Sequence, residues 1–156
     1  MRIPASGSVF VDTNVFVYAY DRSEPVKRER AREVMLTLGE TRRGVVSTQV
    51  LTEFVAVTTR GRDPLLDESF AIGQARALAG AWPVLAVERE TVLLAFACRE
   101  THDVHLWDAV LWATARRARI DTVVSEDFQD GRCIEGVRFV DPFTAGFDLT
   151  ALAAGG

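Results

Sequence analysis

The sequence predicts a single α/β domain over residues 1–156, with a short, mainly parallel central sheet flanked by helices. Short β-like runs alternate with longer segments of helical periodicity, and no internal repeat, low-complexity tract or linker divides residues 8–142. The composition, 48% hydrophobic and 26% charged, is that of a globular protein that needs no disulfide or structural metal. Strands that alternate with helices of this length are typical of parallel strands joined by crossovers.

The first elements follow from apolar runs and capping residues. Residues 8–12 (SVFVD) form a compact apolar run suited to a strand buried on both faces. Residues 15–21 predict a short helix, with Thr13 or Asn14 as its cap. A longer helix is expected to begin at Pro25, because proline is tolerated in the first helical turn.

The next elements repeat the pattern of a strand followed by a cap and a helix. Residues 44–47 (GVVS) read as a strand, after which Ser47 or Thr48 caps a helix over residues 48–60. A polar turn with a proline (GRDP) then separates this helix from the next, over residues 67–80.

The rest of the chain is read in the same way. The expected elements are a strand at 83–87, helices at 88–100 and 104–119, and strands that begin at 122 and 137. The tail from about residue 144 is expected to be frayed.

Charge and cysteine content exclude several classes of protein. The net charge of −4 gives no overall positive field, so a nucleic-acid partner would have to be bound by a local group of basic residues. Cys98 and Cys133 have neither CxxC nor zinc-site spacing, and of the 18 basic residues only Lys27 is a lysine. No apolar stretch reaches the length of a membrane span and the N-terminus lacks the features of a secretory signal, so we expect a cytoplasmic protein without a membrane partner.

Four acids interrupt apolar segments. Asp12 and Asp127 follow buried runs, so both should lie beyond the carboxyl ends of parallel strands, where α/β sheets bind ligands. Glu53 falls at the margin of the apolar face of its helix, and Asp108 is surrounded by apolar neighbours in LWDAVLW. Carboxylates that face an apolar interior are unfavourable unless they are paired, hydrogen-bonded or bound to a metal.

Four converging carboxylates would also repel one another, by about 4 kcal/mol for each pair at about 4 Å with an effective dielectric of about 20. A hard divalent cation such as Mg²⁺ removes this conflict, because it takes oxygen ligands from carboxylates, water and substrate phosphate. The pattern therefore predicts a site for one or two divalent cations suited to phosphodiester chemistry.

Each acid also has a purely structural interpretation. Asp12 could cap the following helix, Glu53 could pair with Arg60 or another arginine, and Asp108 could be neutralised by an arginine or by a helix N-terminus. SEDFQDG could be an ordinary acidic turn, in which Glu126 or Asp130 takes the place of Asp127.

The acids lie in the segments VFVDTNVFVYAYD, QVLTEF, WDAVLWATA and VVSEDFQDG. Together, in their order and spacing, these segments resemble the PIN-domain family, and in particular the VapC ribonuclease toxins of type II toxin–antitoxin systems. The resemblance covers nearly the whole chain and implies a PIN-like three-layer sandwich. It also implies that Mg²⁺ or Mn²⁺ at the acids activates water to cut RNA, which leaves a 5′-phosphate.

By this resemblance Asp12, Glu53, Asp108 and Asp127 match the family's acidic quartet, although Glu126 beside Asp127 leaves open which acid is the fourth ligand. The polar residues expected to support the quartet are Thr13, Asn14 and Ser125. The resemblance further implies a homodimer that is silenced by a VapB-like antitoxin reaching into the acidic pocket.

Other charged residues have two interpretations each. The arginines that could border an RNA-binding groove, or simply form a solvated rim, are Arg42, Arg43, Arg60 and Arg62. For His102 and His105, structural or capping roles are favoured over a role as general base.

Three alternatives to a toxin nuclease follow from the same residues. The first is a PIN-type nuclease that processes RNA without an antitoxin, and the second is a non-catalytic RNA- or partner-binding scaffold. The third, an aspartyl-phosphate hydrolase, is disfavoured because Asn14 stands where its second aspartate would be and Lys27, the sole lysine, lies too early in the chain.

Overall fold

The computed structural model describes residues 7–155 and has a six-stranded sheet in the order β3-β2-β1-β4-β6-β5. All neighbouring strands are parallel except β5, which runs antiparallel to β6. The strands are β1 (Val9–Val11), β2 (Gly44–Ser47), β3 (Val84–Leu85), β4 (Thr122–Val124), β5 (Cys133–Ile134) and β6 (Val137–Val140). The mainly parallel sheet predicted from the sequence is confirmed.

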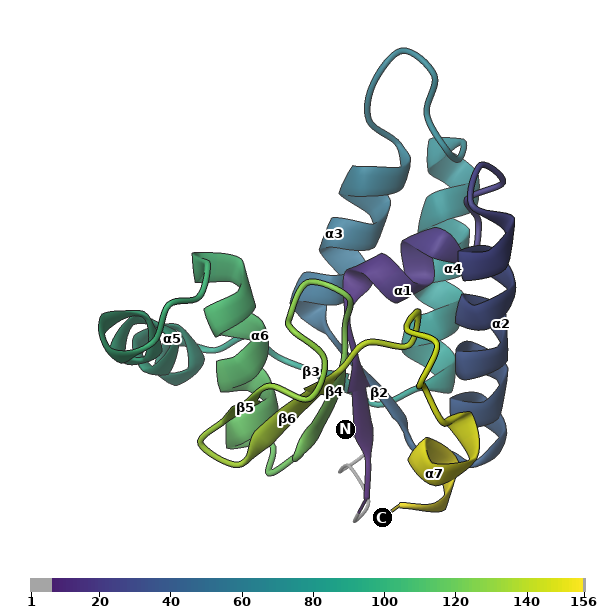
Figure 1. Cartoon of the computed structure of the whole chain (residues 1–156). Helices are drawn as coiled ribbons and strands as arrows, with labels where there is room; N and C mark the ends of the chain where they lie inside the picture. Colours follow the sequence, from purple (N-terminus) through teal and green to yellow (C-terminus); the bar gives the residue numbers. More distant parts are fainter. Residues whose placement is uncertain (1–6, 156) are drawn as a thin grey trace.

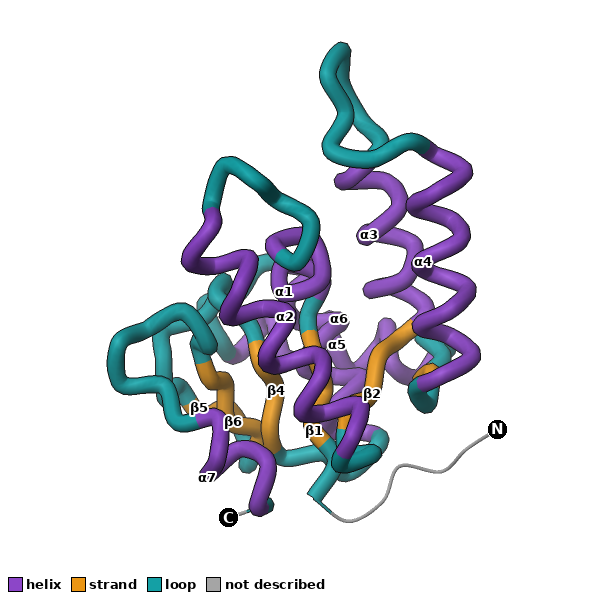
Figure 2. Tube along the Cα trace, turned by 90° about the vertical axis from the view of Figure 1, so that its right-hand side faces the viewer, coloured by secondary structure: helices purple, strands orange, loops and turns teal. Residues whose placement is uncertain are grey.

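Helices cover both sides of this sheet, which gives three layers (Figure 1). They are α1 (Thr13–Tyr18), α2 (Pro25–Glu40), α3 (Thr48–Thr58), α4 (Glu68–Ala81), α5 (Arg89–Thr101), α6 (Leu106–Arg117) and α7 (Leu149–Ala154). The paired helices α5 and α6 lie on one side, and α2 and α7 lie on the other. Figure 2 shows α3 and α4 as a hairpin that stands beside α1 and α2.

The register of the central strands sets where the chain leaves the sheet. Val11 of β1 lies opposite Val124 of β4, and the backbone N–H of Asp12 donates to the carbonyl of Val124 at 2.9 Å. The residues that follow these two strands, Asp12 and Ser125, therefore lie side by side at the carboxyl edge of the sheet. Parallel strands place such positions together however far apart they are in the sequence.

The core explains why these short strands form. All of β1 and β2 is buried, because helices cover both faces of the sheet. Trp112 of α6 is fully buried, and its indole N–H donates to the carbonyl of Ile134 at 3.0 Å. This bond satisfies the one polar atom of the largest core side chain.

Two sequence predictions about caps are settled by the structure. Asp12 is the N-cap of α1, which confirms the capping role considered in its structural interpretation, and the expectation of Thr13 or Asn14 is wrong. Ser47, one of the two predicted candidates, caps α3 by accepting a hydrogen bond from the N–H of Val50 at 3.1 Å.

The structure also contains a hairpin that periodicity did not predict. Cys133, for which the sequence predicts no strand, begins the two-residue strand β5. Glu135 and Gly136 connect β5 to β6 with φ of 46° and 85°, the left-handed values that a tight two-residue hairpin turn requires. A strand of two residues is too short to show alternation, so only the turn residues carried a signal.

The expectation of a frayed tail from about residue 144 is wrong for residues 149–154, which form α7. Asp148 caps this helix by accepting from the N–H of Ala151 at 3.0 Å. At the other end, the guanidinium of Arg43 donates to the carbonyls of Leu152 and Ala153. A cation at a helix C-terminus satisfies carbonyls that have no partner within the helix and complements the helix dipole.

Gly44→Ala is expected to destabilise the protein by about 1–3 kcal/mol, because the new methyl group would overpack the core. A Cβ at this position would lie 2.6 Å from the ring of Trp82, which is itself buried. Gly73→Ala within α4 is the matched control, since nothing lies within 4 Å of its Cβ position. Urea denaturation should show a lower midpoint for Gly44→Ala and an unchanged or higher midpoint for Gly73→Ala.

Candidate active site

Asp12 is the most buried acid at the carboxyl edge of the sheet, with 6% of its surface exposed. One carboxylate oxygen, Oδ1, accepts a hydrogen bond from the backbone N–H of Thr13 at 2.7 Å. The other, Oδ2, accepts from the hydroxyl of Ser125 at 2.7 Å and from the amide of Asn14 at 3.3 Å. These donors fix the orientation of the carboxylate without supplying a positive charge.

Polar side chains connect the ends of β1 and β4 behind this carboxylate. The amide of Asn14 donates to Ser125 Oγ at 3.2 Å, and the backbone N–H of Asp127 donates to the same oxygen at 3.1 Å. Ser125 is completely buried, so its hydroxyl is shielded from water. The loop that carries Asp127 is thereby tied to the residues around Asp12.

Glu53 reaches the same edge from the second turn of α3. The hydroxyl of Thr13 donates to Glu53 Oε2 at 2.9 Å, and the amide of Gln49 donates to Oε1 at 2.9 Å. Arg60, the partner considered in the structural interpretation of Glu53, makes no ion pair with it. Glu53 is instead held beside Asp12 by the residue that follows Asp12 in the chain.

Asp108 lies in the first turn of α6 and is half-buried. Its carboxylate and that of Asp127 have no hydrogen bond or ion pair with any of residues 7–155. The N-terminus of α6 favours a negative charge at this position through the helix dipole. Asp108 is therefore not neutralised by an arginine within the described part of the chain.

The four carboxylates interact electrostatically. Burial raises the pKa of Asp12 from 3.8 to about 7, hydrogen bonds from Ser125 and Thr13 oppose this rise, and the negative charges of Asp127 and Glu53 add to it. The charges of Asp127 and Glu53 therefore both disfavour the ionised form of Asp12.

The pKa of Asp108 is also raised, first by burial and then by the charge of Asp127, with a smaller contribution from Glu53. His105 opposes the shift. The structure therefore brings together Asp12, Glu53, Asp108 and Asp127, which the sequence drew from four separate segments.

The donor set fits a hard divalent cation in its chemistry. It consists of carboxylate oxygens that disfavour one another's charge and of neutral hydroxyl and amide groups that hold them, and a cation would relieve this repulsion. Within residues 7–155, however, no three His, Cys, Asp or Glu side chains already surround a common point as the ligands of one ion. The acids are neighbours and do not form a preassembled cage.

The uncertainty between Glu126 and Asp127 has a geometric answer. The carboxylate of Glu126 accepts from Tyr18 Oη at 2.6 Å and from Lys27 Nζ at 2.7 Å, so it is already engaged. The negative charge of Asp127 contributes to the raised pKa of both Asp12 and Asp108. Asp127, and not Glu126, is therefore the acid of this loop that acts on the other carboxylates, and its role as the fourth ligand stays a prediction. The roles of Lys27 and Tyr18 were missed because no local pattern relates them to Glu126, about 100 residues away.

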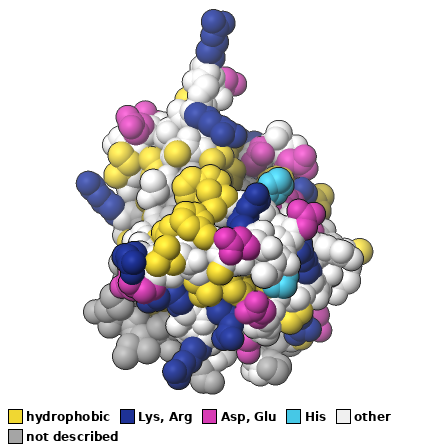
Figure 3. Space-filling view, turned by 90° about the vertical axis from the view of Figure 1, so that its left-hand side faces the viewer, with side chains coloured by type: hydrophobic (Ala, Val, Ile, Leu, Met, Phe, Trp, Pro, Cys, Tyr) yellow, Lys and Arg dark blue, Asp and Glu magenta, His cyan; other side chains and the backbone are white. Residues whose placement is uncertain are grey.

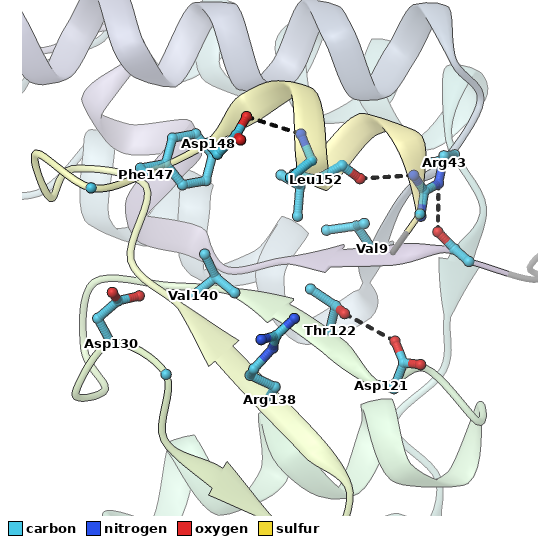
Figure 4. A pocket seen from close by; sticks show the side chains of 15 residues that line it. Val9, Arg43, Asp121, Thr122, Asp130, Arg138, Val140, Phe147, Asp148 and Leu152 are labelled. Carbon is cyan, nitrogen blue, oxygen red and sulfur yellow. Dashed lines mark hydrogen bonds between the residues drawn. The ribbon is translucent and has the colours of Figure 1, made fainter.

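Two of the arginines expected to border an RNA groove are elsewhere. Arg42 and Arg43 precede β2 and lie at the amino edge of the sheet, opposite the acids. Arg43 lines a cavity of about 310 Å³ between α7 and the sheet, where it binds the end of α7 (Figure 4). Arg42 has a left-handed φ of 54° and is exposed. Their assignment to the groove is wrong.

Arg60 and Arg62 follow α3 and are exposed. They lie beyond the C-terminal end of α3, whereas Glu53 lies in its second turn, and a role beside the site stays a prediction. His105 is the N-cap residue of α6, and His102 lies 3.5 Å from Glu135 Oε1. Both positions suit the structural roles that the sequence favoured for the histidines.

An apolar hollow adjoins Glu53, one of the four acids. It has a volume of about 470 Å³ and is lined by Glu53 and Gln49 of α3 and by Trp107 of α6, among others. Trp107 is 64% exposed and directly precedes Asp108. Figure 3 shows hydrophobic side chains gathered into a band on the face formed by α5 and α6.

None of the helices in the described chain has the length and apolar character that crossing a bilayer requires.

Comparison with known proteins gives consistent matches. Residues 9–129 match the family model described as PIN domain. Among curated proteins, "Ribonuclease VapC23" of two Mycobacterium tuberculosis strains, CDC 1551 / Oshkosh and H37Rv, is 35% identical over 81 residues. This match covers 51% of the chain and 63% of the relative, so the chain spans less than two thirds of the relative's length.

Solved structures share the fold at low sequence identity. A toxin–antitoxin complex from Klebsiella pneumoniae has a TM-score of 0.63 at 17% identity, covering 87% of this chain and 98% of that one. DNA-bound VapBC from Salmonella typhimurium has a TM-score of 0.60 at 18% identity, covering 86% and 98%. Mycobacterium tuberculosis VapC20, a sarcin–ricin-loop-cleaving toxin, has a TM-score of 0.54 at 20% identity, covering 74% and 87%.

The unfolding free energy of the metal-free protein is expected to fall as pH rises from about 4 to about 7. The folded state binds a proton at Asp12 up to a pKa of about 7, whereas the unfolded chain releases it near 3.8. The stabilisation is complete below the lower value and is lost through the higher one, by an amount on the order of a few kcal/mol. Urea titrations in chelator should show this slope, and Asp12→Asn should flatten it. A stability that rises over this range would contradict a raised pKa.

Asp108→Asn is expected to raise the melting temperature of metal-free protein, because it removes one charge from the repelling cluster and keeps the shape of the side chain. Thermal unfolding in chelator measures the effect. Glu40→Gln, an exposed acid at the far end of α2, is the control and should leave the temperature unchanged. An unchanged or lower temperature for Asp108→Asn would mean that Asp108 is stabilised by a partner inside the fold.

Proposed function

Since this chain belongs to the PIN domain family, we propose that it is a divalent-metal-dependent endoribonuclease and the toxin of a toxin–antitoxin pair. The observation that carries the proposal is the gathering of four carboxylates at the carboxyl edge of the sheet, one of them almost fully buried. A family member that served only as a scaffold would have no physical reason to keep mutually repelling acids together. The relatives named as ribonucleases support the same reaction.

The residues that would hold Mg²⁺ or Mn²⁺ are Asp12, Glu53, Asp108 and Asp127. When bound, the cation would neutralise charge on the scissile phosphate and lower the pKa of an attacking water. The carboxylates of Asp108 and Asp127 have no donor among residues 7–155, so both can accept a proton or a ligand without first losing a hydrogen bond.

The supporting residues keep the cluster in place before substrate arrives. Thr13 has two roles, since its N–H binds Asp12 and its hydroxyl binds Glu53. Ser125 and Asn14 hold the second oxygen of Asp12. Fixing the ligands in this way reduces the reorganisation that is needed when the site is loaded.

The hollow beside Glu53 supports an RNA substrate. Its volume of about 470 Å³ accommodates a nucleobase, and the exposed ring of Trp107 offers a surface on which a base can stack. A phosphate at the acids would bring the neighbouring base to this hollow. Arg60 and Arg62 would add local positive charge that the protein as a whole lacks.

The proposed partners are RNA, a second copy of the chain and a VapB-like antitoxin. Leu93 and Phe96 of α5 are 47% and 46% exposed and lie three residues apart, on one face of the helix. Such an apolar face, on the side drawn in Figure 3, is suited to an interface between two copies. A toxin that acts on cellular RNA and is held by an antitoxin would work in the cytoplasm.

The test is cleavage of a panel of structured RNAs by purified protein with Mg²⁺ or Mn²⁺. Asp12→Ala and Asp108→Asn should each reduce cleavage to background, as should chelator, while Glu40→Gln should cleave like the parent protein. Products should carry 5′-phosphates, which end-specific enzymatic labelling detects. Cleavage that survives chelation or either substitution at full rate would overturn the assignment, and binding of RNA without cleavage would indicate the scaffold alternative.

A further inference from the structure

The only lysine of the chain lies in a cluster that the proposed function does not use. We propose that Lys27, together with Tyr18 and Phe143, is a positioning residue that holds Glu126 and thereby places Asp127 in the acidic cluster. This inference deepens the proposed function and rests on it. It assigns no chemical step to Lys27, which acts on the site only through Glu126.

The contacts of Glu126 define the cluster. Lys27 Nζ forms an ion pair with Glu126 Oε2 at 2.7 Å, and Tyr18 Oη donates to Oε1 at 2.6 Å. Lys27 Nζ also lies 3.1 Å from Tyr18 Oη, so ammonium, phenol and carboxylate close a triangle. Both oxygens of Glu126 are therefore engaged from outside the acidic site.

Aromatic rings enclose the ammonium group. Lys27 Nζ lies 4.4 Å from the centre of the Tyr18 ring and 5.4 Å from that of Phe143, and the two rings meet edge to face at 5.0 Å. The side chains of Lys27 and Glu126 are 33% and 22% exposed, so water screens the pair less than it would at the open surface. Four segments meet here: α1, α2, the loop after β4 and the segment before α7.

Glu126 transmits this restraint because its backbone is held as well. Its N–H donates to Asn14 Oδ1 at 3.5 Å, and the N–H of Asp127 donates to Ser125 Oγ at 3.1 Å. The carboxylate of Asp127 has no donor within residues 7–155, so its position depends on this backbone. Lys27 also neutralises a fifth acid and draws it to the side, which leaves the adjacent Asp127 to face the cluster.

Lys27→Met tests the proposal, because it removes the charge and keeps an unbranched side chain. In metal-free protein, amide hydrogen exchange at Glu126 and Asp127 should become on the order of tenfold faster. In cleavage assays kcat should fall by on the order of tenfold, as for residues that orient metal ligands, while KM for RNA stays within about twofold. Lys27→Arg should restore most of both.

Two further variants guard against simple loss of folding. Tyr18→Phe removes the hydroxyl that donates to Glu126 and accepts from Lys27, keeps the ion pair, and should shift exchange and kcat in the same direction by less. Arg30→Met is the matched control on α2, since Arg30 pairs with Glu33 at 3.6 Å and does not touch Glu126. It should leave exchange at Asp127 and kcat unchanged. Lys27→Met added to Glu126→Gln should have no further effect, since Lys27 acts through Glu126.

Unchanged exchange at Glu126 and Asp127 in Lys27→Met would overturn the proposal, as would equal losses in Lys27→Met and Arg30→Met. A rise in KM with unchanged kcat would also overturn it, because that result assigns Lys27 to RNA binding. Absence of cleavage by the parent protein would refute the nuclease and would leave the exchange measurement to decide the positioning role.

Discussion

The site depends on the burial of one carboxylate at the end of a parallel strand. Asp12 emerges from a strand that is covered on both faces, and it lies beside Ser125 because the neighbouring parallel strand ends at the same level. Only neutral groups reach its oxygens. A buried anion without a cationic partner is costly, and the raised pKa of Asp12 expresses this cost.

The residues around Asp12 hold its carboxylate and those of its neighbours by hydrogen bonds from neutral groups. Thr13 joins Asp12 to Glu53 through its backbone N–H and its hydroxyl, and the Ser125 hydroxyl joins Asp12 to the backbone N–H of Asp127. Repulsion alone would spread these carboxylates apart. Neutral hydrogen-bond donors hold the carboxylates close together. Because these donors carry no charge, they do not balance the negative charge of the acids. Glu126 differs from these acids, because its negative charge is balanced by an ion pair with Lys27.

Two basic side chains, Arg43 and Lys27, are engaged away from the acidic cluster. Arg43 donates to a carbonyl at the C-terminus of α7, and Lys27 forms an ion pair with Glu126. Either side chain would neutralise the cluster if it lay within it. Because both side chains are engaged elsewhere, neither of them neutralises the carboxylates of the site.

The sequence by itself determined the alternation of strands and helices and the positions of the acids relative to them, because burial imposes periodicities that a single chain displays. Asp12 after SVFV and Asp108 within LWDAVLW could be selected on that basis alone. Only the tertiary structure paired Glu126 with Lys27, placed Arg43 at the end of α7 and formed β5 and α7. The contacts of Glu126 and Arg43 join residues about 100 positions apart, and β5 and α7 are too short to show a hydrophobic period. The interactions that stabilise them form only once the chain has folded.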